Sequence, residues 1–481
     1  MFVGRERELS ELRDQFNSDQ RSVVLVYGKR RVGKTCLIRE SLKDFDGIVV
    51  NHLCVKSSYE GNLRLLCRSV ALSFGLSASF SFSTLFDLFD FLKSQGRRIV
   101  IILDEYQYFK ESGKDTDVDS LMQVIADSLP GNIKLVLCGS YITIMKDLLK
   151  ESDPLFGRFT KIIHLEEFDY LDASRFCPGL PVREKIRFYS VFGGSPFVLS
   201  CLDYGKSLER NIIDLTMEPD SLLRSYIENI ALREIQRAFD IRILEVIGNS
   251  RKRFNDICML AGFEDSSLLD KQLKNLLNME TVSKVAPINA KNDRKKQFYE
   301  INDNLMRFYF TYVFSFDSLI YKFGPEQYFR NAVSGSLNTF ISYRFEKIAN
   351  QYLVRQARAG NLPDVLDFGT FWYDDRKNRR NGQFDCVLRR QSGYDFYEVK
   401  FYDSPMSHKE CEEEEKQVRA IVDMVCNRIG FICSSGFDFS SDRYDLIEGK
   451  DLFVDPGLSA ARCSLPGPGL LQTIPSCDNG G

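Results

Sequence analysis

Residues 22–41 read SVVLVYGKRRVGKTCLIRES, and this stretch decides how the first part of the chain folds. It opens with an apolar, β-branched run that is typical of a buried strand, and it closes with residues typical of a helix. Between them, GKRRVGKT at 28–35 fits the pattern G-x-x-x-x-G-K-[ST] at every fixed position. A chance glycine turn would not explain the strand before the loop and the helix after it. The stretch therefore predicts a loop that wraps phosphate groups.

We expect this loop to bind ATP and Mg²⁺ as cofactors. Gly28 and Gly33 let successive backbone N–H groups point at phosphate oxygens. The side chain of Lys34 can reach the β- and γ-phosphates, and the hydroxyl of Thr35 can bind Mg²⁺. The predicted ATP-binding residues are Gly28, Lys29, Arg30, Arg31, Val32, Gly33, Lys34, Thr35, Cys36, Ser140 and Arg158.

An acidic pair follows an apolar run in IVIILDEYQ at 99–107. Asp104 ends the predicted strand, where its carboxylate can hold Mg²⁺ and the waters around it. Glu105 follows at once and could orient or polarise the attacking water. An ordinary exposed strand end is the alternative interpretation. Together with the loop, the pair predicts Lys34, Asp104 and Glu105 as catalytic residues of an ATPase.

Two further residues have open roles. Ser140 ends the predicted strand KLVLCGS, where it could sense the γ-phosphate or could be an ordinary turn residue. Arg158, in SDPLFGRFT, could contact the nucleotide, could complete the site of a neighbouring subunit, or could be structural. The sequence therefore leaves the oligomeric state open between a homo-oligomer and a monomer.

Short apolar runs before residue 170 predict a parallel sheet with crossover helices, so the fold class is α/β. These runs are 22–28, 47–50, 98–105, 134–140 and 161–165. The predicted parts of the chain are an ATPase domain at 1–170, a helical lid at 171–235, a winged helix-turn-helix at 236–310, a helical linker at 311–340, a mixed α/β domain at 341–455, and an unstructured tail at 456–481.

The winged helix is predicted from three helical patterns that precede a basic hairpin. In the third pattern Leu269, Leu273, Leu276 and Leu277 recur at three- and four-residue steps. A strand pair then flanks the polar loop NAKNDRKKQ at 289–297.

Composition excludes several classes of protein. The 481 residues contain 64 Lys and Arg against 67 Asp and Glu, so DNA binding has to come from local patches such as 251–254, 291–296 and 376–380. Solvated charged faces are the alternative for each patch. The 13 Cys are isolated and His is rare, which favours a reduced cytoplasmic protein without a zinc site. No run approaches the ~18 apolar residues of a membrane span.

The order FVGRERELSEL, GKRRVGKT, ILDEYQ, LCGS, DPLFGR and GGSPFVL resembles the archaeal-type ATPase family among the AAA+/STAND-like P-loop ATPases. The resemblance covers residues 1–235. It implies that Val3, Gly4 and Arg5 lie near the adenine base and that GGSP lies in a helical lid. It also implies a winged helix and a C-terminal domain similar to PD-(D/E)XK nucleases.

The C-terminal sequence is consistent with such a nuclease-like domain. Asp385 in QFDCVL and Glu398 with Lys400 in YEVK lie at a spacing that suits adjacent antiparallel strands. Two carboxylates can hold a divalent cation, and Lys400 can stabilise the transition state. These three residues are the predicted catalytic set.

The resemblance adds Glu346, from the helix before the strands, as a metal ligand. The predicted metal ligands of the whole chain are Thr35, Asp104, Glu346, Asp385 and Glu398. Gln417 matches a Gln of some family members, whereas Gln383 stands where related chains often have an acid. A salt bridge between strands is the alternative, and an inactive domain would keep most of these residues.

The sequence thus favours a cytoplasmic, Mg²⁺-dependent ATPase that regulates a DNA-directed nuclease-like domain. The main alternative is a nucleotide-controlled switch or scaffold whose nuclease-like domain is inactive and only binds a partner. A transporter or small-molecule kinase is a weaker third interpretation, since no acceptor site or membrane partner is evident.

Overall fold

The computed structural model describes residues 2–77, 79–112, 117–228, 239–375, 380–421 and 424–456. The chain divides into two compact units. Unit 1 comprises Met1–Ala286 and Asn292–Phe340, and unit 2 comprises Pro287–Lys291 and Ile341–Gly481. The predicted tail from 457 onward and residues 229–235 of the predicted lid lie outside the described residues.

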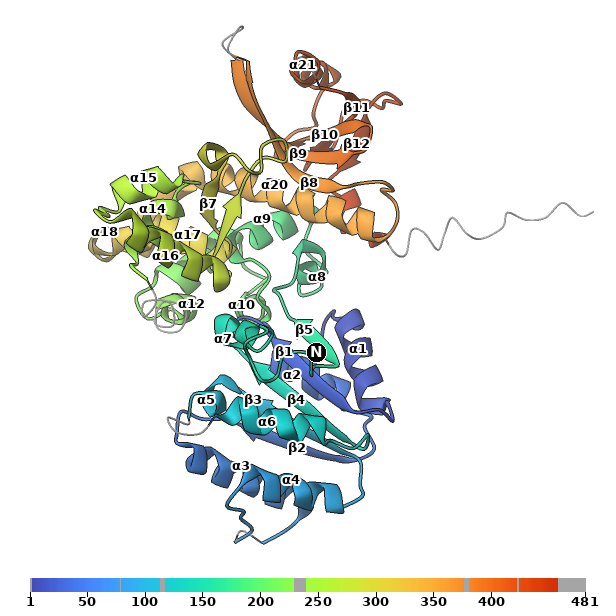
Figure 1. Ribbon diagram of the computed structural model, residues 1–481. Helices are drawn as coiled ribbons and strands as arrows, with labels where there is room; N and C mark the ends of the chain where they lie inside the picture. Colours follow the sequence, from blue (N-terminus) through green and yellow to red (C-terminus); the bar gives the residue numbers. More distant parts are fainter. Residues whose placement is uncertain are drawn as a thin grey trace, which may run out of the picture. The chain divides into compact units, whose positions relative to one another are not determined.

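Unit 1 begins with a parallel sheet in the order β2-β3-β4-β1-β5 (Figure 1). The strands are β1 (Ser22–Tyr27), β2 (Ile48–Leu53), β3 (Ile99–Asp104), β4 (Ile133–Gly139) and β5 (Lys161–His164). Every pair in this sheet is parallel. β1 and β4 lie inside the sheet and are buried along their whole length, as their continuous apolar sequences predict. The predicted α/β class is confirmed for this part of the chain.

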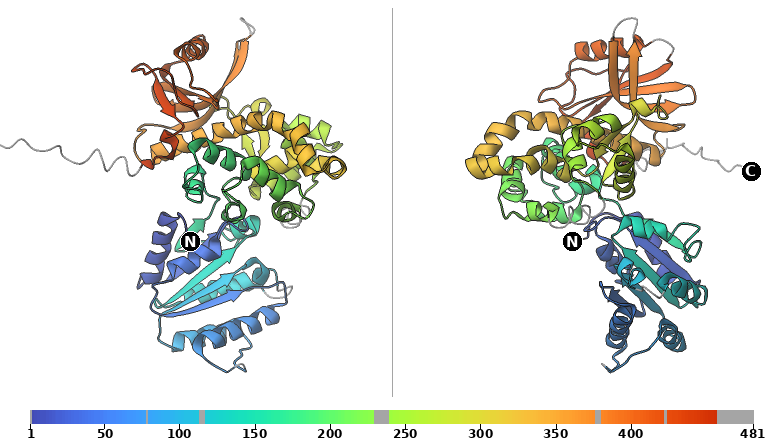
Figure 2. Two further views of the ribbon diagram at one scale, coloured as in Figure 1. Left: turned by 180° about the vertical axis from the view of Figure 1, so that it is seen from behind. Right: turned by 60° about the vertical axis from the view of Figure 1, so that its left-hand side comes forward.

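Helices cover both faces of the sheet (Figures 1 and 2). They are α1 (Glu6–Asn17), α2 (Lys34–Ser41), α3 (Tyr59–Phe74), α4 (Leu85–Ser94), α5 (Gln107–Lys110), α6 (Val118–Asp127) and α7 (Ile142–Asp147). Val24 and Val26 of β1 share one apolar cluster with α1 and α2. Val23 and Leu25, which point to the opposite face, share another with α3, α4 and α6.

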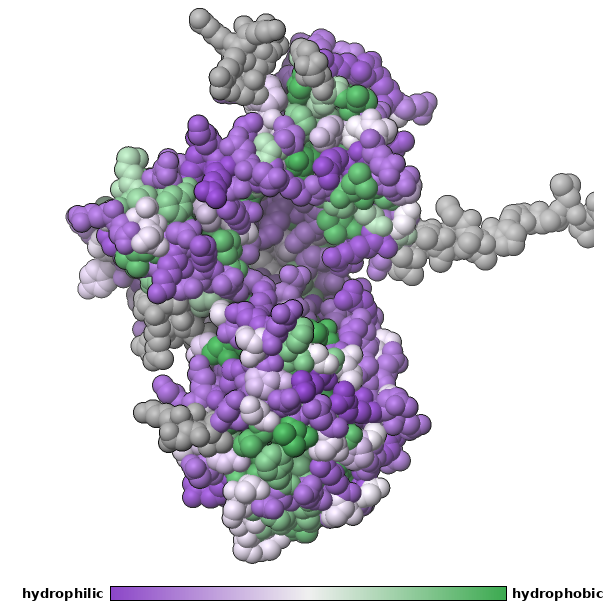
Figure 3. Space-filling model, viewed as in Figure 1, coloured by the Kyte–Doolittle hydropathy of each residue, from purple (hydrophilic) through white to green (hydrophobic). Residues whose placement is uncertain are grey.

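α3 packs beside the edge strand β2, so its outer face meets solvent. Leu72 is 84% exposed there, and Leu76 and Phe86 nearby are also exposed. Figure 3 shows the apolar surface that gathers over α3 and α4.

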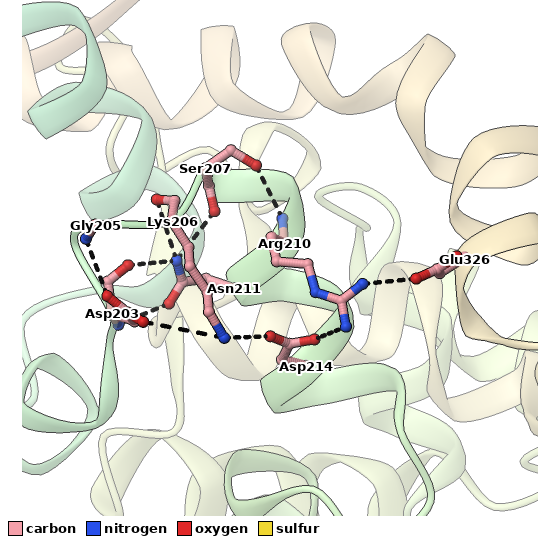
Figure 4. Close-up of polar contacts among 8 residues, drawn as sticks. All are labelled: Asp203, Gly205, Lys206, Ser207, Arg210, Asn211, Asp214 and Glu326. Carbon is pink, nitrogen blue, oxygen red and sulfur yellow. Dashed lines mark hydrogen bonds and ion pairs between the residues drawn. The ribbon is translucent and has the colours of Figure 1, made fainter.

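A helical region follows the sheet. It contains α8 (Tyr170–Ser174), α9 (Val182–Phe192), α10 (Pro196–Cys201), α11 (Leu208–Ile212), a π-helix at Ile213–Met217 and α12 (Leu222–Tyr226). The buried side chain of Asn211 closes the loop before α11, because it accepts from the N–H of Asp203 and donates to the carbonyl oxygens of Asp203 and Ser207 (Figure 4). Arg210 pairs with Asp214 and with Glu326 of α19.

Helices and a hairpin come next, in the order that the sequence predicts. They are α14 (Arg242–Gly248), α15 (Phe254–Leu260), α16 (Ser266–Asn278), β6 (Val282–Val285) and β7 (Phe298–Ile301). β6 and β7 are antiparallel, and Lys252 forms a bridge with Tyr299 of β7. We call these elements the helix–hairpin module. Unit 1 closes with α17 (Asn304–Tyr312), α18 (Asp317–Phe323) and α19 (Pro325–Tyr328).

The long helix α20 (Ser334–Arg358) begins in unit 1 and ends in unit 2. The sheet of unit 2 is mixed, with the order β12-β11-β10-β9-β8. The strands of this sheet are β8 (Asp367–Asp375), β9 (Arg380–Arg390), β10 (Gly393–Lys400), β11 (Cys426–Cys433) and β12 (Asp445–Glu448). The helix α21 (His408–Arg419) lies between β10 and β11 in the chain. β8, β9 and β10 are antiparallel neighbours, and β10, β11 and β12 are parallel.

Residues 287–291, from the connection between β6 and β7, belong to unit 2 and lie along its edge strand β8. The N–H of Ile288 donates to the carbonyl oxygen of Thr370 at 2.8 Å. Asn289 exchanges hydrogen bonds with the backbone of Trp372. The buried Ile288 side chain lies where a side chain at Gly369 would stand, since a Cβ there would be 2.5 Å from Ile288 Cγ2. We call residues 287–291 the edge segment.

Candidate nucleotide-binding site

The predicted phosphate loop lies between the end of β1 and the start of α2. Gly33 has φ 96°, a conformation that favours glycine. A Cβ at Gly28 would lie 2.1 Å from the carbonyl oxygen of Leu165, so no side chain fits there. Val32 is buried under the loop, whereas Cys36 is exposed on α2. The two glycines are therefore required by local geometry.

Lys34 turns back over its own loop. Its Nζ donates to the carbonyl oxygens of Gly28, at 2.9 Å, and Lys29, at 2.8 Å. An ammonium has three donors, and these contacts use two of them. Burial lowers the pKa of Lys34, although Glu105 and Asp104 act in the opposite direction. The ammonium is thus held at the centre of the loop.

Thr35 and Asp104 meet at the carboxyl edge of the sheet. Thr35 Oγ1 donates to Asp104 Oδ2 at 2.8 Å. Hydroxyl and carboxylate oxygens suit Mg²⁺, which takes one or two protein ligands and completes its shell with phosphates and water. These two residues, both predicted from the sequence, fit a magnesium ion bound together with a nucleotide.

Glu105 follows with φ 54°, the left-handed conformation that non-glycine residues seldom adopt. Its Oε2 accepts from Ser140 Oγ at 2.7 Å and from the side-chain amide of Gln107. Ser140, whose role the sequence left open, therefore lies directly beside Glu105. Gln107 was not predicted, although its place just after the acidic pair was a signal.

Arg158 lies at the other edge of the sheet. It precedes β5, and in a parallel sheet the strand starts lie opposite the edge that carries Asp104 and Ser140. Its guanidinium pairs with Asp127 at 3.1 Å and donates to the carbonyl oxygen of Phe156. This placement does not bring Arg158 to the nucleotide site of its own chain, and a role in a neighbouring subunit stays a prediction.

Two segments named by resemblance meet at Phe168: residues 3–5, expected near the adenine base, and GGSP, expected in a helical lid. The guanidinium of Arg5 lies 4.3 Å from the centre of the Phe168 ring, and Gly4 is also close to that ring. The N–H of Phe168 donates to the carbonyl oxygen of Gly194, within GGSP. A Cβ added at Gly33 would lie 3.9 Å from Cγ of Pro196, so the loop passes close to that proline. The first residues of the chain, GGSP and the loop thus form one continuous set of contacts.

A carboxylate of the helix–hairpin module reaches this edge of the sheet. Glu280, between α16 and β6, pairs with Lys146 of α7 at 2.6 Å and with His164 of β5 at 3.0 Å. Burial opposes ionisation of Glu280, but hydrogen bonds from His164 and Lys146 outweigh it and lower the pKa to about 2. The His164 ring stacks at 4.7 Å on Tyr27, the residue before the phosphate loop.

Carboxylates around the phosphate loop also act on the pKa of Lys29, a residue of that loop. Burial opposes the charge of Lys29, yet surrounding carboxylates raise its pKa overall. Those carboxylates are Glu167, Asp303, Glu280 and Glu166. Nothing in the sequence pattern pointed to Glu280, because it lies in a turn far along the chain.

In unit 2, the structure brings Asp385 and Glu398 together. Tyr397 pairs with Cys386 across β10 and β9, so the next residues outward are Glu398 and Asp385. Burial and the charge of Asp385 raise the pKa of Glu398 to about 7. Lys400 donates to Glu398 Oε1 at 2.7 Å and pairs with Glu414 at 3.1 Å. Gln417 donates to Glu414.

The three predicted carboxylate ligands of unit 2 lie around the buried thiol of Cys386. Burial and the charges of Asp385, Glu346 and Glu398 all raise the pKa of that thiol. Glu346 is also linked to β9 through its carbonyl oxygen, which accepts from Cys386 Sγ at 3.7 Å. Across the described ranges, no group of three or more His, Cys, Asp or Glu side chains is arranged to hold a metal ion. A metal site formed by Glu346, Asp385 and Glu398 stays a prediction.

The basic patches are partly paired. Arg251 pairs with Glu300 at 2.9 Å, and Arg253 lies over the ring of Phe298. Lys291 pairs with Asp367 at 2.6 Å. Residues 376–379 of the third patch lie outside the described residues.

A family model described as an ATPase domain predominantly from Archaea matches residues 2–202. Residues 2–202 are therefore similar to the ATPase domains that this model describes. The match contains the loop, the acidic pair, Ser140 and GGSP, which confirms the family resemblance for this part of the chain. A second model, which describes archaeal and bacterial proteins of unknown function, matches residues 309–416 and so covers the end of unit 1 and part of unit 2.

Two curated proteins are similar to this chain over very different lengths. An uncharacterized protein of Methanocaldococcus jannaschii is 28% identical over 415 residues, which are 84% of this chain and 88% of that protein. An uncharacterized ATP-binding protein of the same organism is 43% identical over 44 residues, which are 9% of this chain and 75% of that protein.

Solved structures are similar at low identity. A Walker-type ATPase of Pyrococcus abyssi has a TM-score of 0.45 and 20% identity, covering 64% of this chain and 96% of its own. The ORC2 protein of Aeropyrum pernix, in its ADPNP-ADP complexes, has a TM-score of 0.44 and 14% identity, covering 64% and 93%. Among the described residues of the present chain, no helix has the length and apolar character needed to cross a membrane.

Proposed function

We propose that this protein hydrolyses ATP with Mg²⁺ and that its nucleotide state controls binding of DNA by the helix–hairpin module and unit 2. The observation that carries the proposal is the convergence of Lys34, Thr35, Asp104 and Glu105 at one edge of the sheet. These groups supply what phosphoryl transfer needs, namely a phosphate cradle, a metal-binding pair and a carboxylate for water.

Each group has a defined task in this reaction. The loop N–H groups and the Lys34 ammonium bind the β- and γ-phosphates and hold them in place. Thr35 and Asp104 would hold Mg²⁺, which neutralises phosphate charge when bound. Glu105 accepts a hydrogen bond from the attacking water and orients it, once its own bonds to Ser140 and Gln107 rearrange.

Control by nucleotide rests on the ion pairs of Glu280. ATP brings several negative charges to a loop whose Lys29 already feels Glu280 and other carboxylates. A movement of Lys29 or His164 changes the electrostatic interactions of Glu280 with these residues, and Glu280 is part of the helix–hairpin module. The ATPase site and the module therefore share one electrostatic network.

DNA binding is supported by the form of the module. Three helices followed by an antiparallel hairpin are the order of a winged helix, and Lys252 adds a third strand position beside β7. Clustered Lys and Arg would contact phosphates in a salt-dependent way.

For unit 2 we favour a binding platform over a nuclease. This choice is supported by the ion pairs of Lys400 with Glu398 and Glu414, which already partner the Lys of the predicted catalytic set. A second candidate function, metal-dependent cleavage, is favoured by one observation. Burial, and after it the charge of Asp385, raise the pKa of Glu398 to about 7, and a cation between the two carboxylates would relieve their repulsion.

One experiment separates these functions. Wild type, Lys34→Ala and Asp385→Ala are incubated with labelled single-stranded, duplex and branched DNA, with Mg²⁺ or Mn²⁺ and with or without ATP. The proposal expects ATP turnover that Lys34→Ala abolishes, and DNA binding without cutting. Cutting that needs Asp385 would establish the second function. Turnover that survives Lys34→Ala in a folded protein would contradict the ATPase assignment of the loop.

A further inference from the structure

Arg30 lies in the phosphate loop, but its side chain runs toward the ends of β3 and β4. Its Nε is 3.4 Å from Ser140 Oγ, and its Nη2 donates to the hydroxyl of Tyr108 at 3.1 Å. The guanidinium also lies 5.6 Å from the centre of the Tyr141 ring. Tyr108 follows β3, and Ser140 and Tyr141 follow β4, so residues after two strands fix the direction of the guanidinium.

This direction leads to the acidic pair. Ser140 Oγ, which Arg30 approaches, donates to Glu105 Oε2 at 2.7 Å. A single hydroxyl group therefore separates the guanidinium from the carboxylate that would orient the attacking water. The Lys34 ammonium lies in the same loop, where its Nζ donates to the carbonyl oxygens of Gly28 and Lys29. The loop thus carries a second cation, Arg30, whose side chain is directed to the carboxylate of the acidic pair.

We infer that Arg30 is a catalytic residue that binds the γ-phosphoryl oxygens of ATP in the transition state, from within the same chain. The inference rests on the proposed ATPase function and extends it. During transfer to water, negative charge spreads over the γ-phosphoryl oxygens, and a planar guanidinium can donate two hydrogen bonds to them. Arg30 would exchange its contact with Ser140 for these oxygens.

The other arginines named from the sequence point elsewhere. Arg31, the next residue, stacks on Phe197 at 3.8 Å and on Tyr226 at 4.8 Å, both in the helical region after the sheet. Arg158 pairs with Asp127 at the opposite edge of the sheet. Within this set of three, Arg30 alone faces Glu105.

The test compares wild type, Arg30→Ala and Arg30→Lys. Arg210→Ala serves as the control, because Arg210 forms a surface ion-pair network far from the loop in sequence (Figure 4). Steady-state ATP hydrolysis gives kcat and KM, and titration gives the Kd for ADP. Formation of the ADP–aluminium fluoride complex reports on the transition state, and circular dichroism reports on folding.

We expect Arg30→Ala to lower kcat by ~10³-fold or more, as for an arginine that stabilises this transition state. Its Kd for ADP stays within a few-fold of wild type, its aluminium fluoride complex is lost, and added guanidinium ions restore part of kcat. Arg30→Lys recovers little, since an ammonium lacks the planar fork. Arg210→Ala behaves as wild type.

The inference is overturned if Arg30→Ala keeps kcat within a few-fold of wild type. It is also overturned if Arg30→Ala loses affinity for ADP in proportion to activity, because that marks a role in ground-state binding or folding. If the wild-type protein shows no Mg²⁺-dependent ATP hydrolysis, the proposed function itself is wrong. The inference about Arg30 is then wrong as well, without any comparison of the variants.

Discussion

The hydroxyl of Thr35 donates a 2.8 Å hydrogen bond to the carboxylate of Asp104, although 69 positions separate the two residues in the chain. The contact joins the start of α2 to the end of β3. It holds two oxygen atoms side by side at the edge of the sheet where the loop would present phosphates. This pair defines where Mg²⁺ would bind.

The first prediction concerns Asp104. Asp104→Asn keeps the shape of the side chain but removes its charge, so we expect the Mg²⁺ requirement of ATP hydrolysis to rise by ~10–100-fold. A Mg²⁺ titration of turnover measures the change, and the Kd for ADP without Mg²⁺ is the control. Superimposable titration curves would show that Asp104 does not act on the metal.

The second prediction concerns Glu105. Glu105→Gln keeps the contacts to Ser140 and Gln107 possible but cannot accept a proton, so we expect turnover to fall by ~10²–10⁴-fold. Binding of ATP persists, and the variant accumulates in the ATP-bound form. Rapid filtration with labelled ATP detects that complex. Normal turnover in Glu105→Gln would assign the activation of water to another group.

The third prediction is a pH dependence from Glu280. Its pKa of about 2 is below the ordinary value of 4.5, so its ion pair with Lys146 and its hydrogen bonds stabilise the folded state fully above pH 4.5. This stabilisation is lost as the pH falls from 4.5 toward 2, where Glu280 becomes protonated. Glu280→Gln should lower the free energy of unfolding at pH 7 by ~1–2 kcal/mol, after allowance for the partly exposed Lys146.

Urea unfolding of wild type and Glu280→Gln at pH 7 and pH 3.5 tests this dependence. The difference between the two proteins should shrink at the lower pH, because below pH 4.5 Glu280 binds a proton in the unfolded chain while it stays ionised in the folded protein. An equal difference at both values of pH would indicate that packing, and not charge, is what the substitution removes.

The fourth prediction concerns the edge segment. Ile288 is buried against Phe371 and Phe384 in the core of unit 2. Ile288→Ala should therefore destabilise this unit by ~2–5 kcal/mol. Lys291→Ala removes a half-exposed ion pair with Asp367 and should cost below ~1 kcal/mol. Thermal unfolding of both variants measures the contrast, and similar losses would contradict the assignment of Ile288 to this core.

Local sequence predicted the elements whose signals are local. β1, the loop and α2 follow from an apolar run, two glycines and a helical segment, and Asp104 and Ser140 follow because parallel strands end at one edge. Of the four leucines in α16, Leu269, Leu273 and Leu276 are buried, as the periodicity predicts, while Leu277 is only partly buried.

Contacts between distant parts of the chain were not predictable in this way. Glu346 was named only by resemblance to a motif, and its contact with Cys386 of β9 depends on how α20 packs on the sheet. Arg30 was named only as a member of the loop, since the direction of a long side chain depends on Tyr108 and Ser140. Glu280 lies in a turn with no motif, and its partners Lys146 and His164 come from two other elements.

The edge segment has a consequence for how the protein is made and inherited. Asn289 and its partner Trp372 are 83 positions apart, so the ribosome releases the segment well before β8 exists. Unit 2 must then fold onto a strip of chain that was synthesised earlier and that interrupts the β6–β7 hairpin. A gene fragment that begins at residue 341 would encode the sheet without this strip. Recombination at that apparent boundary would leave Ile288 behind, and the two units are therefore expected to pass between genomes together.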